Sequence, residues 1–196
     1  MWTNVRLVLG ISAGIAINFL PDLIAALRIR SALIDAILTP NAGRMVSPLF
    51  VSGLTGRRVY VDGLENDAGW EVPHVNLVKD AALFLAAPAT ANLVGKLAHG
   101  IADNLVTTAF LACRAPRLVC PAMHPDMWRD PILQDNITRL RQHGVIIVEP
   151  VFGVCSTGDS GVGALADPQT IVNAVEQVLG FQPDSESSDE RDKGRT

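Results

Sequence analysis

Cysteine and basic charge are both scarce in this chain of 196 residues, and each scarcity excludes a class of protein. The three cysteines, Cys113, Cys120 and Cys155, are too few and too scattered for a disulfide framework or a zinc site. We therefore expect no bound metal and a reducing compartment, the cytoplasm. A formal net charge of -4 provides no basic footprint for nucleic acid.

We also expect neither a signal peptide nor an uninterrupted membrane span. The apolar stretch over residues 5–29 is interrupted by Pro21 and Asp22, and its pattern predicts a strand, a glycine turn and a helix. Hydrophobic residues make up 48% of the chain and charged residues 18%, which suits one domain with a large core. Such a chain also exposes apolar surface that can serve as a subunit interface.

Short apolar runs alternate with helical patterns along residues 1–180. This alternation predicts a single α/β domain with a doubly wound parallel sheet. Strands are expected at 5–9, 32–38, 59–61, 83–87, 117–120 and 145–148, and helices at 14–29, 42–51, 75–80, 91–98, 101–111, 132–143 and 167–179. The last segment, 181–196, is rich in Ser, Asp and Glu, and we expect a disordered tail there because it has little apolar area to bury.

Small and polar residues directly follow two of the buried strands, which is where open parallel sheets bind ligands. The segments that carry this pattern are 74–77, 88–92, 100–104 and 121–128. Their order and spacing, over roughly residues 5–165, resemble the homo-oligomeric flavin-containing cysteine decarboxylases. That family includes phosphopantothenoylcysteine decarboxylase and the enzymes that decarboxylate the C-terminal cysteine of lantibiotic precursor peptides. The resemblance implies a Rossmann-like, flavodoxin-like sheet, and a homotrimer or homododecamer with flavin at the subunit contacts.

The loop after the first strand is a candidate phosphate site. Gly10, Ser12 and Gly14 would let backbone N–H groups and a helix N-terminus face an anion, with the Ser12 hydroxyl as a further donor. The family usually has Gly at the position of Ala13 and Ser at that of Gly14, so one hydroxyl contact is missing. The resemblance implies FMN, while the roomier Gly14 leaves FAD open.

Further flavin contacts are implied after the next strands. The family's flavin site includes positions similar to Thr39, Asn41 and Ala42, although Pro-Asn is also an ordinary turn pair. The family motif Pro-Ala-Ser-Ala-Asn-Thr matches residues 88–93, which implies flavin contacts from Pro88, Ala89, Thr90 and Asn92. Asn92 is also a candidate helix cap. Asp103 and Asn104 are expected to hold neighbouring loops or a subunit contact beside the flavin.

Two histidines are the candidate catalytic residues. By resemblance, His74 is the active-site base, a role that a near-neutral pKa suits. In the segment 121–128, His124 stands where the family has the Asn that binds the departing carboxylate, and an imidazole can also donate to a carboxylate. In the same segment, Met123 is implied to contact the flavin, and Met127 and Trp128 to shape the pocket wall.

The glycine-rich segment 153–163 is predicted to be the loop that clamps the substrate. The coenzyme A branch of the family has a Cys there that helps to reduce the ene-thiol intermediate, and alignment on the glycines places Thr157, followed by Gly158, at that point. Cys155 lies two residues upstream. The expected substrate is therefore a precursor peptide ending in Cys. Its decarboxylated product would be released as an ene-thiol. The alternatives are a phosphopantothenoylcysteine decarboxylase and a non-catalytic flavin-binding regulatory subunit.

Overall fold

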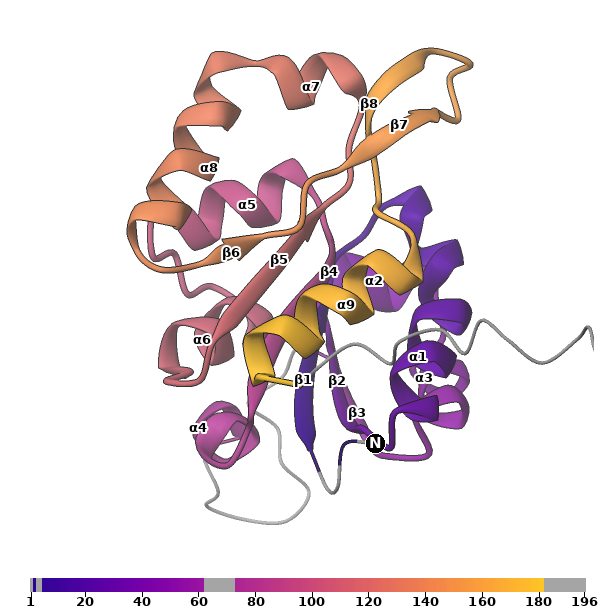
Figure 1. Cartoon of the computed structure of the whole chain (residues 1–196), viewed down its shortest axis with the longest axis vertical. Helices are drawn as coiled ribbons and strands as arrows, with labels where there is room; N and C mark the ends of the chain where they lie inside the picture. Colours follow the sequence, from indigo (N-terminus) through magenta and orange to yellow (C-terminus); the bar gives the residue numbers. More distant parts are fainter. Residues whose placement is uncertain (1, 3–4, 62–72, 182–196) are drawn as a thin grey trace, which may run out of the picture.

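Six parallel strands form the main sheet in the part of the chain that the structure, a computed structural model, describes: residue 2 and residues 5–61 and 73–181 (Figure 1). All pairings within this sheet are parallel, and the strand order is β3-β2-β1-β4-β5-β6. The strands are β1 (Arg6–Ile11), β2 (Leu33–Leu38), β3 (Val59–Val61), β4 (Leu83–Ala89), β5 (Arg117–Pro121) and β6 (Ile146–Ile147). The chain winds outward from β1 to β3 and then crosses to β4, so the predicted doubly wound α/β fold is confirmed and has the Rossmann strand order.

Helices cover both faces of this sheet. One face is covered by α1 (Leu20–Ile29), α3 (Pro48–Thr55) and α9 (Pro168–Leu179), and Figure 1 shows α9 crossing in front of the strands. The other face is covered by α4 (Pro73–Lys79), α5 (Ala91–Ala98), α6 (Leu105–Ala112) and α8 (Pro131–Gln142). Every residue of β4 is buried, as expected for a central parallel strand packed on both sides, which explains its continuous apolar run.

Two of the predicted helices are divided in the structure. The helix expected at 14–29 is a 3-10 helix, η1 (Ile15–Phe19), followed by α1, in whose first turn Pro21 lies. The helix expected at 42–51 is α2 (Pro40–Met45) and then α3, separated at Val46 and Ser47. A residue before proline is disfavoured in the helical region, and Ser47, which precedes Pro48, is extended.

The late glycine-rich segment is not the loop that was predicted. It forms an antiparallel hairpin of β7 (Val151–Val154) and β8 (Ser160–Ala164), and a short helix that was not predicted, α7 (Pro125–Arg129), packs against it. Two close approaches explain the glycines. A Cβ on Gly163 would lie 2.5 Å from the Met123 carbonyl oxygen, and one on Gly161 would lie 2.7 Å from Pro125 Cβ. These glycines therefore allow the hairpin to dock on the turn before α7.

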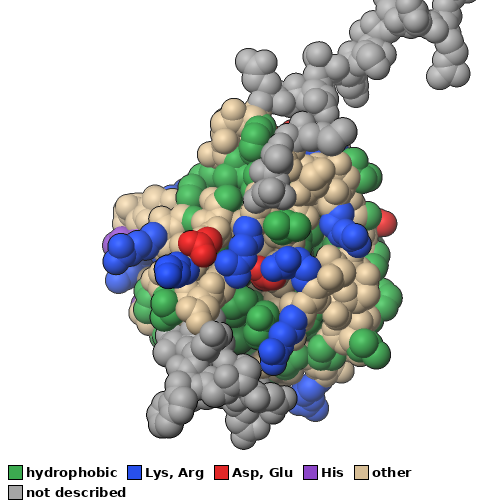
Figure 2. All heavy atoms as spheres, turned by 90° about the horizontal axis from the view of Figure 1, so that it is seen from below, with side chains coloured by type: hydrophobic (Ala, Val, Ile, Leu, Met, Phe, Trp, Pro, Cys, Tyr) green, Lys and Arg blue, Asp and Glu red, His purple; other side chains and the backbone are tan. Residues whose placement is uncertain are grey.

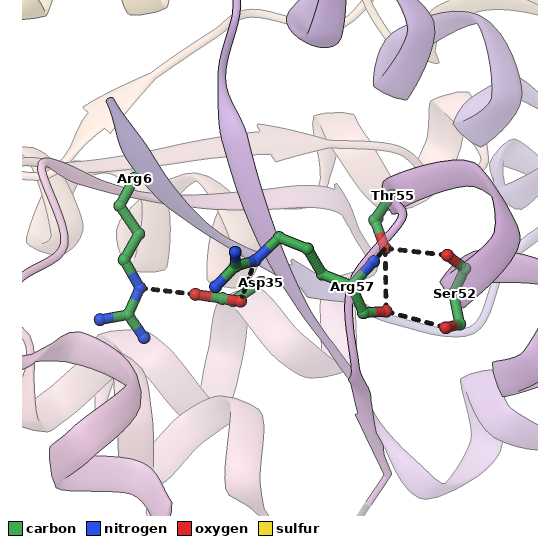
Figure 3. A network of polar contacts seen from close by, with 5 residues as sticks. All are labelled: Arg6, Asp35, Ser52, Thr55 and Arg57. Carbon is green, nitrogen blue, oxygen red and sulfur yellow. Dashed lines mark hydrogen bonds and ion pairs between the residues drawn. The ribbon is translucent and has the colours of Figure 1, made fainter. Parts of the chain in front are cut away.

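A buried carboxylate ties the amino ends of β1 and β2 to the segment before β3. Asp35 on β2 is 5% exposed and accepts hydrogen bonds from Arg6 Nε at 2.5 Å and Arg57 Nε at 2.7 Å (Figure 3). The Ser52 hydroxyl donates to the Arg57 carbonyl at 2.8 Å, which joins the end of α3 to this network. Lys and Arg side chains gather on the face seen in Figure 2, which is viewed from the end of the molecule opposite the hairpin.

The expectations about the C-terminal tail, the cysteines, a membrane span and a metal can be compared with the described residues only. Phe181, expected in the disordered tail, stacks on Trp2 with ring centroids 5.8 Å apart, while residues 182–196 lie outside the described part. The three cysteines are free thiols. Among the described residues no helix has the length and apolarity to cross a membrane, and no group of acidic, His and Cys side chains is placed to hold a metal.

Candidate functional site

A cavity of about 820 Å³ lies where β1, β2, β4 and β5 end. The loops that follow these four strands line it, together with the β7–β8 hairpin. This is the carboxyl edge of the sheet at the switch point between β1 and β4, the usual ligand site of a doubly wound fold. The volume lies within the range of cofactor pockets. The structure therefore brings most of the predicted site residues together.

The first loop forms a cradle at the start of η1. Gly14 lines the cavity in an extended conformation, and a Cβ added to it would lie 3.4 Å from Thr90 Cγ2. Ser12 also lines the cavity, but its hydroxyl is already engaged: it donates to the Pro88 carbonyl at 2.8 Å and accepts from the Thr90 amide at 2.9 Å. The expected hydroxyl donor to a phosphate is thus used to join two loops. Donation to an anion falls to the first amides of η1, which have no partner within the helix.

Helix caps organise the next two loops. The Thr39 hydroxyl accepts from the Ala42 amide at 3.3 Å and caps α2, while Thr39 and Asn41 both line the cavity. The Thr90 hydroxyl accepts from the Leu93 amide at 3.4 Å and caps α5. The prediction that Asn92 is the cap is therefore wrong, and Asn92 instead lies in the first turn of α5 and lines the cavity.

Lys96 is a lining residue that the sequence reasoning missed. Its Nζ lies 2.6 Å from Asp103 Oδ2, and this hydrogen bond is the main reason that the pKa of Asp103 is lowered. Asn104 caps α6 through a reciprocal pair of bonds with Thr107 and donates to Asp103 Oδ1 at 3.0 Å. Lys96 follows Asn92 by one helical turn, so the i, i+4 spacing on α5 was a signal that would have found it.

His124 caps α7 at the opposite wall of the cavity. Its Nδ1 accepts from the Asp126 amide at 3.2 Å, and its Nε2 lies 3.0 Å from Asp159 Oδ2. Both ring nitrogens therefore have partners within the chain, and neither is left to contact a substrate carboxylate in this arrangement. The carboxylate contact expected of His124 stays a prediction, and it would require the ring to exchange one of these partners. Met123 and Met127 line the cavity, as do Cys155 and Thr157 on the hairpin, and the flavin and substrate contacts expected of them stay predictions.

Among the predicted site residues whose side chains the structure describes, six do not line the cavity, and each has a structural role instead. Gly10 packs against the Phe84 ring, Ala42 and Ala89 lie in the core, and Pro88 follows a cis peptide bond and accepts from Ser12. Trp128 packs against the core on the sheet face that α4, α5, α6 and α8 cover, and Gly158 has a φ of +92° in the hairpin turn. The positions that were predicted by motif but do not line the cavity are thus Gly10, Ala42, Pro88, Ala89, Trp128 and Gly158.

His74 lies on α4, away from the cavity of its own chain. The helix ends at Lys79, shortly before β4 begins at the amino edge of the sheet (Figure 1). A helix of seven residues is about 10 Å long. A strand of seven residues, such as β4, is about 23 Å long. The whole helix therefore lies well short of the carboxyl edge. The His74 side chain itself lies outside the described part.

Comparison with known proteins decides the family. Residues 1–180 match the model of the Flavoprotein family. The chain belongs to the Flavoprotein family. This flavoprotein is 36% identical over 176 residues to a probable phosphopantothenoylcysteine decarboxylase of Streptococcus mutans, with 89% of this chain and 98% of that protein covered.

A second relative is longer. The coenzyme A biosynthesis bifunctional protein CoaBC of Bacillus subtilis is 37% identical over 177 residues, which cover 90% of this chain. The flavoprotein spans 44% of the length of that relative.

Solved structures agree with this assignment. The FMN-dependent cysteine decarboxylase SpaF superposes with a TM-score of 0.78 at 32% identity, covering 89% of this chain and 95% of that one. A mutant PPC decarboxylase complexed with pantothenoylaminoethenethiol gives a TM-score of 0.80 at 26% identity, covering 91% and 100%. The resemblance to flavin-dependent cysteine decarboxylases is thus confirmed.

The expected peptide substrate is overturned by these comparisons. Curated relatives with 33–38% identity are a probable phosphopantothenoylcysteine decarboxylase and several bifunctional coenzyme A biosynthesis proteins. The prediction rested on Thr157 standing where the coenzyme A branch has Cys. In the structure Cys155 and Thr157 line the cavity from the same hairpin, so a thiol is retained at this wall. The substitution at residue 157 therefore did not justify excluding that branch.

Proposed function

We propose that this flavoprotein decarboxylates phosphopantothenoylcysteine with FMN as its cofactor. The observation that carries the proposal is the match to the probable decarboxylase of Streptococcus mutans, which spans 89% of this chain and 98% of that protein. The cavity supports the proposal because it lies at the switch point of the sheet and is lined by both polar and apolar residues. Its free thiols fit the reducing compartment in which we place it, the cytoplasm.

The residues of the carboxyl edge suit FMN. The loop at residues 13–16 would offer amides at a helix start to the phosphate, and Thr90 and Asn92, which line the same cavity, would contact the rest of the cofactor. When bound, FMN supplies the two-electron chemistry by which the cysteine thiol is oxidised, so that the neighbouring carboxylate can leave as CO₂. The protein binds and orients both partners and excludes water from the cavity.

Two lining groups suit this substrate. Lys96 is the only Lys or Arg among the described residues that line the cavity, and we assign it to the phosphate of the substrate. Cys155 lies on the hairpin wall, and we assign to it the proton that converts the ene-thiol to the saturated product; the second hydrogen would come as a hydride from the reduced cofactor. The net reaction then loses CO₂ with no overall oxidation.

We propose that His74 acts as the base in the cavity of a neighbouring copy, within a homotrimer or an assembly of trimers. Its own helix is too short to bring it to the carboxyl edge of its own sheet. Large apolar side chains stand exposed beside the cavity, as at a subunit contact. Ile15 is 64% exposed and Phe19 41% on the first wall, and Phe152 and Val154 are 70% and 73% exposed on the hairpin.

The test is product analysis with purified, FMN-loaded protein and phosphopantothenoylcysteine. We expect a product lighter by about 44 Da, the mass of CO₂. A peptide ending in Cys, supplied at the same concentration, should remain unchanged. A protein that binds FMN but converts neither compound would contradict the proposal and favour the non-catalytic regulatory subunit.

A further inference from the structure

Among the described residues, one side-chain hydrogen bond joins the tip of the β7–β8 hairpin to the cap of α7. Asp159, in the turn between the strands, presents Oδ2 to His124 Nε2 at 3.0 Å. The base of the hairpin is held differently, through the backbone: the Met123 amide donates to the Gly163 carbonyl at 2.8 Å. The hairpin wall thus has a fixed base and a tip whose attachment depends on the side chains of Asp159 and His124.

The surroundings of His124 define its tautomer. A neutral ring nitrogen that accepts a backbone N–H carries no proton. Because Nδ1 accepts from the Asp126 amide, the proton of the neutral ring is on Nε2 and points at Asp159. The cap on α7 therefore orients the ring, and the carboxylate of Asp159 is its acceptor.

The turn itself presents the Asp159 carboxylate. The Thr157 hydroxyl donates to the same oxygen, Oδ2, at 2.8 Å, and the Cys155 amide donates to the Asp159 carbonyl at 2.7 Å. Hydrogen bonds from His124 and then from Thr157 lower the pKa of Asp159, so the group is ionised at neutral pH. The Thr157 hydroxyl therefore helps to hold the Asp159 carboxylate in place. At residue 157 this hydrogen bond replaces the thiol that the coenzyme A branch has there.

We propose that Asp159 is a positioning residue of this site, which holds His124 and the hairpin tip together and so sets where the hairpin wall stands. Cys155 and Thr157 lie on that wall. Asp159 was not among the residues predicted from sequence, since no motif marks it. The contact itself does not depend on the identity of the substrate; its consequence for turnover rests on the proposed function.

Cys155 provides a readout that needs no turnover. Burial raises the pKa of the Cys113 and Cys120 thiols, so a thiol reagent such as Ellman's reagent reacts first with Cys155 on the hairpin. In the FMN-loaded full chain, Asp159→Ala and His124→Ala should each raise the labelling rate of Cys155 by about threefold, the scale of one partly exposed hydrogen-bonded pair. The double variant should react no faster than the faster single variant, because both remove the same contact.

Two further variants make the test specific. Asp159→Asn keeps an acceptor oxygen for the Nε2 proton and should stay within about twofold of the wild-type rate. Asp135→Ala removes an exposed carboxylate from α8, which belongs neither to the hairpin nor to the His124 cap, so it should leave the rate unchanged. Unchanged labelling in Asp159→Ala, or effects that multiply in the double variant, would overturn the proposal.

Turnover gives a second readout. Asp159→Ala should raise KM for phosphopantothenoylcysteine severalfold, because the hairpin wall moves while the cofactor loops do not. An unchanged KM would contradict a positioning role. A wild-type protein without activity would remove the proposed function but leave the labelling result to decide on Asp159.

Discussion

Charge in the cavity is concentrated in a few side chains, and Lys96 is the clearest case. It reaches the cavity from α5 and is held there by Asp103, whose carboxylate stays ionised because its pKa is lowered. The pair gives a fixed cation beside Asn92 and Asn104. A fixed ammonium group in a mostly apolar cavity suits one anionic group of a ligand.

Replacing Lys96 should therefore affect the phosphate of the substrate selectively. We expect Lys96→Met to raise KM for phosphopantothenoylcysteine by about tenfold, the loss of one charge-assisted hydrogen bond, and to leave kcat nearly unchanged. Initial rates with pantothenoylcysteine, which lacks the phosphate, should not change. Lys79→Met, on the exposed face of α4, is the matched control. Equal losses with both substrates would argue against a phosphate contact.

The thiol of Cys155 carries a separate prediction. If it donates the proton that completes the reaction, Cys155→Ser should release the ene-thiol, which is about 2 Da lighter than the normal product because it lacks two hydrogens. Thr157→Ser keeps the hydroxyl that bonds to Asp159 and should give the normal product. Mass spectrometry of the two reactions separates these outcomes. A normal product from Cys155→Ser would show that another group delivers the proton.

At the scale of elements, Asp35 holds three segments together at the end of the sheet that is far from the cavity. Its carboxylate is buried between Arg6 and Arg57, and removing one partner of a buried pair leaves the others unpaired. Asp35→Ala should lower the free energy of unfolding by about 3 kcal/mol, measured by urea denaturation. Asp126→Ala, in an exposed pair with Arg129, should leave the transition unchanged. Equal midpoints for the two variants would contradict this account.

The elements also show what sequence patterns capture. The apolar run 83–87 was placed correctly because central parallel strands are buried on both faces, and 91–98 matches α5 residue for residue. The hairpin was missed because its strands alternate weakly and its glycines, typical of loops, are needed for contact with Met123 and Pro125. Such a contact is tertiary, so local composition at 153–163 predicted a loop.

At the scale of the whole molecule, the strand order brings the loops after β1, β2, β4 and β5 to one edge. Residues far apart in sequence, such as Ser12 and Thr90, are bonded there. The motif resemblance located this edge but could not distinguish side chains that face the cavity, such as Asn92, from neighbours such as Ala89 that face the core. That distinction depends on where each strand ends and each helix begins.

The proposed assembly predicts complementation between defective subunits. His74→Asn should remove the base, and Gly14→Asp should block the flavin phosphate, so each homo-oligomer should be inactive. Mixed oligomers, made by unfolding and refolding the two variants together, should regain activity wherever an intact His74 meets an intact flavin site on a neighbouring copy. No recovery in mixed oligomers of confirmed composition would contradict the placement of His74.

The claim on which the account depends is that FMN lies at the carboxyl edge, with its phosphate at the start of η1. An equilibrium titration of FMN, followed by flavin fluorescence, tests it with two matched substitutions. Gly14→Asp places a negative charge in the cradle, while Gly53→Asp places the same charge on the exposed side of α3, where a Cβ meets nothing within 4 Å. We predict that Gly14→Asp weakens FMN binding by at least about tenfold and that Gly53→Asp leaves it unchanged. Equal FMN affinity in the two variants would show that the flavin binds elsewhere.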